Sequence, residues 1–447
     1  MIHKSLLLLI YLFSTFAFSQ DNPASFSLQQ AIDFALENNR TSKNASRDIE
    51  AAKKQKWETI ASGFPQLNAK ADYQDFLKQR VQVIPSEFFG GDSGEFLPVA
   101  FGTKQSFDGS ATISQLLFDG SYLVGLQSAK VFLEISKNAK IKTDLEIRKQ
   151  VINAYGNVLL AEESVKILQK NIVNVEKNLE EISRIYDNGL EEEESVEQLK
   201  ITLSGIKSTF NNVSRFKKLN YQMLNLTLGI HIDSPIVLTD NLETLNMQNI
   251  DLELSDSYFS VENNIDYLIA QNDKTSKELL VKLEKSKALP SLSTFLSGGY
   301  VSFSNDFSFT SNDQKYYGYG LFGLNLNIPL FSSGARGAST QRAKINLEKA
   351  KDNLTETEQR LKLQIATAKS DYQFAIEDYD NKKENLKLAE RIEHKNQVKF
   401  YEGISSSFDL RQAQIQLYTA QQEFLQAMYD VINKKAELET LLYTINN

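Results

Sequence analysis

The sequence predicts a mainly α-helical protein with four membrane-length β-strands, built as two similar halves. The tripeptide ENN at 37–39 recurs at 262–264, and Pro65 and Pro290 keep the same offset of 225 residues. Long stretches of both halves place apolar residues in alternating steps of three and four, which is typical of supercoiled helices. The stretches after the two prolines alternate apolar and polar residues with a period of two, which indicates β-strands.

Residues 1–19 have the pattern of a secretory signal peptide. Lys4 precedes an apolar run from Leu6 to Phe13, and small residues stand at the cleavage site before Gln20. The run is too short to span a bilayer, and no later stretch reaches the roughly 18 apolar residues of a membrane helix. We therefore expect an exported chain that is soluble or enters a membrane as β-strands.

The composition excludes several kinds of site. The chain has no Cys, which excludes disulfides, thiolate metal sites and a lipid anchor on an N-terminal cysteine. The net charge of −8 becomes −9 once Lys4 is removed, which argues against nucleic-acid binding. His231 and His394 are interpreted as surface residues rather than metal ligands or catalytic bases. We expect no metal, no cofactor and no enzyme activity.

The first repeat is assigned to residues 26–227, with helices over 28–62, a β-hairpin over 66–119 and a helical hairpin over 121–227. Asn38 and Asn39, and Asn263 and Asn264 in the second half, are expected to cap or break the helices that follow them. Pro65 ends the incoming helix and favours extended geometry in the residue before it, so the β-hairpin begins there. Gly120 marks the return from strand to helix.

A connector over 228–262 precedes the second repeat, 263–443, with a helix over 263–288, a β-hairpin over 290–331 and a helical hairpin over 335–443. Pro290 and Gly334 repeat the roles of Pro65 and Gly120. Gly189 and Gly403 lie 214 residues apart, as do Gly120 and Gly334. A continuous helix between the two glycines of one half would be about 100 Å long, far longer than a compact domain needs.

The longest apolar seam lies between 147 and 186. Its members are Ile147, Val151, Ala154, Val158, Ala161, Val165, Leu168, Ile172, Val175, Leu179, Ile182 and Tyr186. Similar seams begin at Val196 and Leu410, each after a Gly-containing turn. Each half is therefore expected to contain an antiparallel helical hairpin of the coiled-coil type.

The four predicted strands are about ten residues long, the length that crosses a bilayer when tilted. Four strands cannot close a barrel, and an open edge in hydrocarbon leaves backbone groups unpaired at several kcal/mol each. If the strands lie in a membrane, several chains must therefore contribute to one barrel. A dimer with eight strands and a trimer with twelve both satisfy this condition.

The order of these elements resembles the TolC family of outer-membrane efflux channels over essentially the whole mature chain. The most specific match is the second turn, through Phe400, Gly403, Ser406, Asp409, Leu410 and Ala413. The resemblance implies a homotrimer in the outer membrane of a Gram-negative bacterium, with a twelve-stranded β-barrel and an α-barrel tunnel through the periplasm. It also implies as partners a periplasmic adaptor (membrane fusion) protein, an inner-membrane pump of RND, ABC or MFS type and outer-membrane lipid.

The resemblance places the periplasmic tip, where the adaptor docks, at two turns: Asp187, Asn188, Gly189, Leu190, Glu191 and Glu192, and Glu402, Gly403, Ile404 and Ser405. Asp409 falls where family members carry a tunnel-facing aspartate, so three copies would form a carboxylate ring that narrows the bore and attracts cations. Gln412 stands where some members have a second aspartate, which argues against strong block by divalent cations. The alternative is that Asp409 only favours the start of the last helix.

Two further groups have open alternatives. The run 191–194, EEEE, is a solvated first helical turn or, in three copies, an acidic mouth or a docking rim for a basic adaptor surface. The aromatic residues that begin the fourth strand are interpreted as a membrane-interface girdle, with a buried sheet core as the alternative. They are Tyr316, Tyr317, Tyr319 and Phe322.

We predict an exit channel that passes solutes from the periplasm or an inner-membrane pump to the exterior without an energy source of its own. The nearest candidate for a nucleotide site, SSGARGAS at 332–339, lacks the Lys of a phosphate loop. The alternative is an exported periplasmic or surface coiled-coil scaffold, which would explain the helical seams but not the strands. An exported enzyme is the third class, and the sequence offers it no paired histidines and no localised acid pair.

Overall fold

The computed structural model describes residues 24–256 and 259–444, so the expected signal peptide lies outside the described residues. The chain forms two compact units. Unit 2 consists of Ile49–Ser136 and Ala270–Leu354, and unit 1 contains the remaining described residues. Each unit takes segments from both sequence repeats, so the units do not coincide with the repeats.

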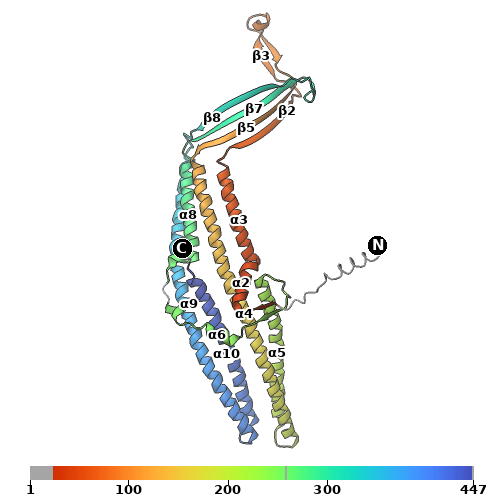
Figure 1. Cartoon of the computed structure of the whole chain (residues 1–447), viewed down its shortest axis with the longest axis vertical. Coiled ribbons are helices and arrows are strands. Elements are labelled where there is room, and N and C mark those ends of the chain that lie inside the picture. The colour runs from red at the N-terminus through yellow and green to blue at the C-terminus, as the bar shows by residue number, and fades with distance from the viewer. Residues whose placement is uncertain (1–23, 257–258, 445–447) are drawn as a thin grey trace, which may run out of the picture. The chain divides into compact units, whose positions relative to one another are not determined.

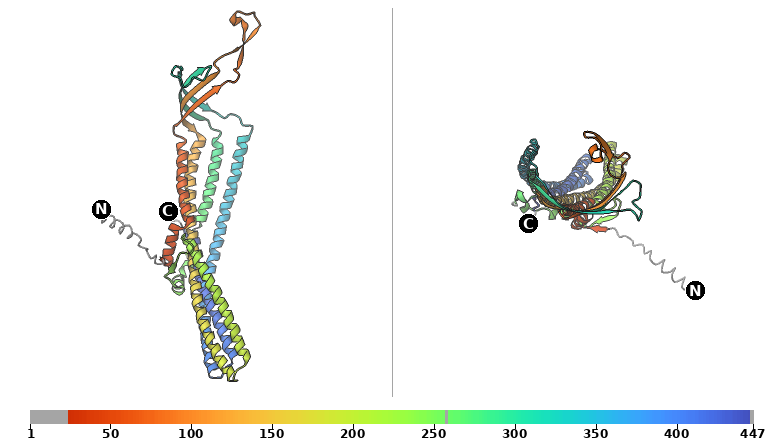
Figure 2. Two further views of the ribbon diagram at one scale, coloured as in Figure 1. Left: turned by 90° about the vertical axis from the view of Figure 1, so that its right-hand side faces the viewer. Right: turned by 90° about the horizontal axis from the view of Figure 1, so that it is seen from above.

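Unit 2 contains a four-stranded antiparallel sheet with the order β2-β5-β7-β8 (Figure 1). The strands are β2 (Gln66–Asp75), β5 (Gln105–Asp119), β7 (Ser291–Ser304) and β8 (Tyr317–Asn327). β5 of the first half pairs with β7 of the second half along its length, from Gln105 opposite Ser304 to Asp119 opposite Ser291. The two expected hairpins are therefore neighbours in a single sheet, which Figure 2 shows to be strongly curved.

The register gives this sheet one apolar and one polar face. A row of exposed apolar side chains crosses all four strands, and its members are Leu67, Ile113, Leu296 and Phe322. The opposite face carries Asn68, Thr112 and Ser297 in one row, and the Thr112 and Ser297 hydroxyl oxygens lie 2.8 Å apart. This alternation is typical of strands that separate lipid from water.

Between β2 and β5 the chain forms a second, two-stranded sheet that the composition of this stretch does not predict. It consists of β3 (Val81–Pro85) and β4 (Phe96–Ala100), joined through the short 3₁₀ helix η1 (Ser86–Phe89). The Ser86 hydroxyl donates to Asp92 O at 2.8 Å and ties the connection together. The expected β-hairpin over 66–119 therefore contains four strands rather than two.

Four helices contribute residues to both units, namely α3 (Arg40–Ala61), α4 (Gly120–Asp187), α8 (Ile265–Ser286) and α9 (Ala335–Tyr401). The other helices are α2 (Leu28–Asn38), α5 (Glu193–Leu228), α6 (Leu242–Gln248), α7 (Glu253–Asp256) and α10 (Ser407–Leu442). The strands β1 (Ala24–Phe26) and β6 (Ile236–Leu238) form a parallel pair, and η2 (Val261–Asn263) precedes α8. Within 24–256 and 259–444, no helix is both long enough and apolar enough to cross a membrane.

The main core of unit 1 follows the predicted seam. Val151 and Val158 of α4 are fully buried, and α10 contributes the fully buried Val431 and Leu438. Spacings of seven residues along both helices keep these side chains on one stripe, so the two helices pack along their length. The coiled-coil character expected from the sequence is therefore present in the core.

Two fully buried tyrosines attach the connector between the repeats to this core. Tyr155 Oη lies 2.9 Å from the Asp240 carboxylate, while Tyr372 Oη donates to Asn249 O at 2.6 Å and accepts from Asp251 N at 2.8 Å. Burial raises the pKa of both phenols, so both remain protonated and able to donate. The connector is thus held by one tyrosine from each repeat.

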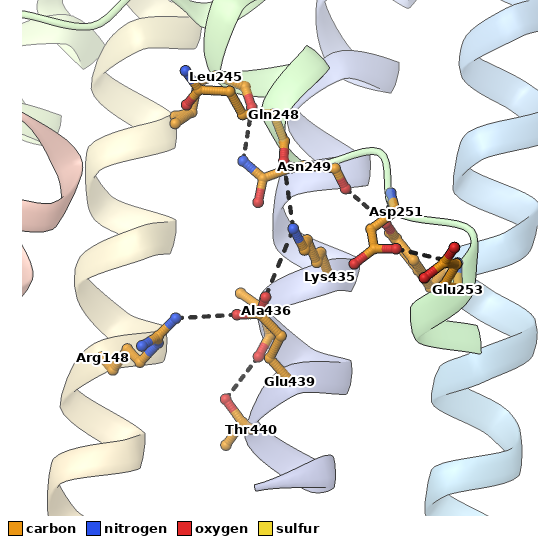
Figure 3. A network of polar contacts seen from close by, with 11 residues as sticks. Arg148, Leu245, Gln248, Asn249, Asp251, Glu253, Lys435, Ala436, Glu439 and Thr440 are labelled. Carbon is orange, nitrogen blue, oxygen red and sulfur yellow. Dashed lines mark hydrogen bonds and ion pairs between the residues drawn. The ribbon is translucent and has the colours of Figure 1, made fainter. Parts of the chain in front are cut away.

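Charged side chains add a second set of contacts to the connector (Figure 3). Lys435 Nζ on α10 donates to Gln248 O at 3.4 Å, at the end of α6. Arg148 on α4 pairs with Glu439 on α10 at 3.2 Å. These contacts join α4 and α6 to the same stretch of α10, around Lys435 and Glu439.

Asn39 and Asn264 are the caps expected at the start of α3 and α8, and each also joins two helices of its own repeat. Each side-chain oxygen accepts from the backbone N–H two residues ahead, at 2.8 Å for Asn39 and 2.9 Å for Asn264. The Asn39 amide donates to Thr227 O in the last turn of α5 at 2.7 Å. The Asn264 amide donates to Leu441 O in the last turn of α10 at 2.9 Å. One residue type therefore satisfies a helix start and a helix end in both repeats.

We expect Asn264→Ala to lower the free energy of unfolding by about 1–3 kcal/mol, because it leaves the Leu441 carbonyl and a helix-start N–H without partners at a buried position. Thermal unfolding of the purified protein, followed by circular dichroism, measures the change. Asn263→Ala is the matched control, since Asn263 is the exposed neighbour. Equal shifts in the two variants would contradict the bridging role of Asn264.

Candidate functional site

Both helical hairpins turn through the same backbone geometry. Gly189 and Gly403 have φ values of +75° and +73°. The residues that follow, Leu190 and Ile404, donate their N–H groups to the carbonyl five residues earlier, at 3.1 Å and 2.9 Å. This ending requires a residue with positive φ, which glycine adopts without a clash of a side chain. Leu190 and Ile404 are 79% and 71% exposed, so each turn presents one aliphatic side chain to solvent.

The helix after the second turn, α10, begins with a capping box. Ser406 Oγ accepts from Asp409 N at 3.2 Å, and Asp409 Oδ2 accepts from Ser406 N at 3.2 Å and from Ser405 Oγ at 3.1 Å. These donors, led by Ser406, hold the pKa of the Asp409 carboxyl below its usual value. Asp409 is therefore the third-position partner in the capping box of Ser406, and Gln412 is exposed one turn further along α10.

Hydrogen bonds to two carboxylates connect the first hairpin to the second close to the turns. Tyr401 Oη on α9 donates to Glu181 Oε2 on α4 at 2.5 Å. Ser407 Oγ donates to Glu191 Oε1 at 3.1 Å, and Ser195 Oγ donates to the same oxygen at 2.7 Å. Burial and then the bond to Glu181 raise the pKa of Tyr401 to about 12, so its phenol remains a donor. We call the Tyr401–Glu181 and Ser407–Glu191 contacts the hairpin latch.

A small apolar cluster lies beside the hairpin latch and draws on all four helices of the two hairpins. Its buried members are Val175, Ile182, Val196, Leu199, Phe400 and Leu410. The sequence predicts the seams that supply this cluster but not the latch. The partners Glu181 and Tyr401 are 220 residues apart, and such a contact leaves no periodic or local signal.

The four glutamates at 191–194 do not act as one group. Glu193 and Glu194 lie in the first turn of α5, where carboxylates favour the helix dipole, and Glu192 is the N-cap residue. These three are exposed, whereas Glu191 is half-buried in the hairpin latch. The interpretation of this run as a solvated first helical turn therefore applies to Glu193 and Glu194.

The boundaries between helix and strand look alike in the two repeats, but the glycines at these boundaries are needed for different reasons. Pro65 and Pro290 directly precede β2 and β7. Gly334 has a φ of +80°, whereas Gly120 starts a helix that passes close to its neighbour. A Cβ at Gly120 would lie 2.7 Å from Leu289 Cδ1. One glycine is needed for backbone conformation and the other for close packing.

The four aromatic residues predicted to form one membrane-interface girdle do not share a face of the sheet. Tyr317 and Tyr319 lie on the polar face, where the Tyr319 hydroxyl donates to an aspartate of β5 at 3.0 Å. Phe322 lies in the apolar row, and the Tyr316 ring centroid is 6.4 Å from that of Phe107 on the same face. Tyr317 and Tyr319 therefore lie on the opposite face of the sheet from Phe322, because neighbouring residues of a strand point to opposite faces.

The comparisons with known proteins agree with this architecture. Residues 260–442 match the family model described as outer membrane efflux protein. A search of curated proteins found no match. Among solved structures, CusC is 18% identical, with 96% of this chain and 95% of that chain covered and a TM-score of 0.74.

Two further outer-membrane proteins are similar to the chain to a comparable degree. VceC from Vibrio cholerae is 17% identical, with 93% of this chain and 95% of that chain covered and a TM-score of 0.72. The CmeC outer membrane channel from Campylobacter jejuni is 18% identical, with 93% and 85% covered and a TM-score of 0.73. At these identities the likeness shows the fold.

The family match and the whole-chain fold confirm the predicted class. Residues 260–442 form an outer membrane efflux protein domain, and the described chain as a whole has the fold of the TolC-type channels. Its predicted location in the outer membrane and its function as an efflux exit channel are confirmed with it.

We expect Gly189→Ala and Gly403→Ala each to destabilise the hairpin by about 1–2 kcal/mol, because a side chain is strained at positive φ. Hydrogen exchange of the turn amides measures the local loss. Gly205→Ala is the matched control, since it lies within α5 and an added Cβ would meet nothing within 4 Å. It should be neutral or stabilising by up to about 1 kcal/mol. Turn variants as stable as Gly205→Ala would contradict the assignment.

Asp409→Asn is expected to lower the thermal midpoint of unit 1 at neutral pH. The donors around Asp409 hold its folded-state pKa below the ordinary value of 3.8. Its contribution is therefore fully present above that value and is lost as the pH falls through the lower folded-state pKa. The midpoint difference from wild type should stay constant from neutral pH to about pH 5 and shrink only in stronger acid. A difference that vanishes near neutral pH would contradict this, and Glu402→Gln in the turn is the control.

Proposed function

We propose that three copies of this chain form a closed duct from the periplasm through the outer membrane, with the two hairpin turns at the periplasmic end. The observation that carries the proposal is the order of the four-stranded sheet. β2 and β8 are its outermost strands, so each has one edge that no strand of the described chain pairs. In hydrocarbon each unpaired backbone group costs several kcal/mol, which favours pairing of β2 in one copy with β8 in the next.

The number of copies follows from the interior that a conduit needs. Two copies would bring eight strands, and an eight-stranded barrel is just wide enough for its own side chains. Three copies bring twelve strands and leave a bore. The polar row of Asn68, Thr112 and Ser297 would then face water, and the apolar row through Leu67 would face lipid.

In this proposal the duct performs no chemistry and supplies no energy. It keeps a polar solute in water while the solute passes a layer in which each desolvated polar group costs several kcal/mol. Energy and cargo selection come from an inner-membrane pump of RND, ABC or MFS type, reached through a periplasmic adaptor at the turns. The exposed Leu190 and Ile404 offer the adaptor apolar contacts, and Glu192, Glu193 and Glu194 offer partners for basic side chains.

The hairpin latch is proposed to hold the periplasmic end closed at rest. Glu181 and Glu191 accept the latch bonds close to solvent, so water can replace Tyr401 and Ser407 at modest cost. The apolar cluster around Val175 needs no such exchange and would keep the helices of each protomer together. Asp409 contributes as well in this view, because three carboxylates around the bore would favour cations.

Single-channel recording in planar bilayers tests both the duct and its gate. Wild-type protein should migrate as a heat-labile trimer on unheated gels and insert as a channel that is mostly closed. The double variant Tyr401→Phe with Ser407→Ala removes both latch bonds, and it should raise the open probability at least about tenfold. Tyr186→Phe with Ser204→Ala is the matched control, since it removes the same groups from exposed positions on α4 and α5.

The same recordings separate the possible roles of Asp409. Asp409→Asn keeps a side-chain oxygen for the cap and removes the charge, so a fall in cation selectivity would support the ring. Unchanged selectivity would leave Asp409 as a cap only. A soluble monomer without conductance would overturn the proposed duct, and equal open probability in the latch and control variants would overturn the gate alone.

A further inference from the structure

The helical segments next to the sheet of unit 2 have a charge opposite to that of the whole chain. These segments are residues 49–61, 120–132, 275–289 and 335–347, and we call them the basic collar. Together they contain eleven Lys and Arg residues and four Asp and Glu residues, whereas the whole chain has a net charge of −8. The positive charge is therefore concentrated where four helices of one unit meet its sheet.

Exposed aromatic side chains mark the boundary between the basic collar and the sheet. Trp57 is 59% exposed, Phe64 is 50% exposed, and their ring centroids lie 6.1 Å apart in an edge contact. Phe331, between β8 and α9, is 87% exposed. Trp and other aromatic residues are typical of the boundary between a hydrocarbon layer and water, because their rings prefer that mixed environment.

Along α3 and into β2, basic, aromatic and aliphatic side chains follow one another in the order expected at a membrane surface. Lys53 and Lys54 precede Trp57 by four and three residues, so all three side chains share one side of the helix. Phe64 and then Leu67, the first member of the apolar row, follow along the chain. Cation, indole and apolar side chains appear in the order of the media that they would meet at a membrane surface, namely headgroup, interface and hydrocarbon.

A groove between α3 and α4 lies within the basic collar and offers space beside one of its lysines. It measures about 210 Å³ and is lined by the small residues Ala52, Gly125 and Ala129, with Lys56 and the exposed ring of Phe132 at its sides. An ammonium group, small side chains and an aromatic ring suit a phosphate headgroup with the start of its acyl chain.

We propose that the basic collar binds the anionic headgroups of phospholipids in the membrane leaflet on its side of the sheet. The proposal rests on the proposed function, since it requires the sheet to lie in a bilayer. Phosphate groups complement the excess of Lys and Arg, and the apolar face of the sheet continues the same surface into the hydrocarbon. Such binding sets the depth of the channel and enriches anionic lipid around it.

Trp57 makes a direct test possible because it is the only tryptophan of the chain. The full-length protein is reconstituted in vesicles of phosphatidylcholine and phosphatidylglycerol, with bromine on the acyl chains of one lipid at a time. Bromine quenches tryptophan fluorescence on contact. At equal mole fraction, brominated phosphatidylglycerol should quench Trp57 more strongly than brominated phosphatidylcholine does. The apparent enrichment of phosphatidylglycerol around Trp57 should be about fivefold if one lysine contacts its headgroup.

Two variants with equal changes of charge provide the comparison. Lys53→Gln with Lys54→Gln and Lys56→Gln should remove the preference for the anionic lipid, and raised salt should weaken the preference in wild type. Neutralisation of three exposed lysines in unit 1 is the control and should leave the preference unchanged; the control positions are Lys177, Lys200 and Lys395. Trimer formation on unheated gels checks that both variants assemble.

The possible outcomes separate this proposal from the proposed function. Equal quenching by both brominated lipids overturns the basic collar and leaves the channel intact. If neither brominated lipid quenches Trp57 in protein that is bound to vesicles, the boundary between the basic collar and the sheet does not lie at the bilayer. This result would overturn the membrane placement of the sheet as well. A preference that survives the α3 substitutions overturns the assignment to Lys53, Lys54 and Lys56.

Discussion

The pairing of β5 with β7 is the interaction on which the rest of the structure depends. These strands come from different halves of the sequence, and their pairing joins two hairpins into one sheet. Two separate hairpins would have four free edges, whereas the joined sheet has two, on β2 and β8. Each free edge is costly in hydrocarbon, so this pairing lowers the number of contacts that other copies must supply. It also aligns the apolar rows of both halves on one face.

The repeated sequence leads to repeated contacts in some places and not in others. Asn39 and Asn264 make the same pair of bonds, because a helix start and a helix end need partners in both halves. Gly120 and Gly334 occupy equivalent positions in the two halves but are required for different reasons. Gly120 allows close packing against a neighbouring helix, whereas Gly334 adopts a positive φ. Equivalent residues therefore have equivalent roles only where both halves contain the same backbone N–H and C=O groups in need of a hydrogen-bond partner.

The two helical hairpins combine apolar seams with a few polar bonds near their turns. The apolar cluster needs no particular orientation to remain stable, whereas the bonds of Tyr401 and Ser407 to carboxylates are directional and compete with water. Such a combination can keep four helices associated while their ends change contact.

Periodicity by itself predicted the helices and the strands, because steps of three and four or of two follow directly from backbone geometry. The constant offsets between the two ENN tripeptides, the prolines and the glycines predicted the duplication and the glycine turns. The turn around Gly403 also carried the most specific resemblance to the TolC channels. Only the tertiary structure decided that β5 meets β7, that Tyr319 points away from the apolar face, and that Glu181 meets Tyr401. These features depend on strand register and on contacts between distant segments, and no local pattern of residues encodes either.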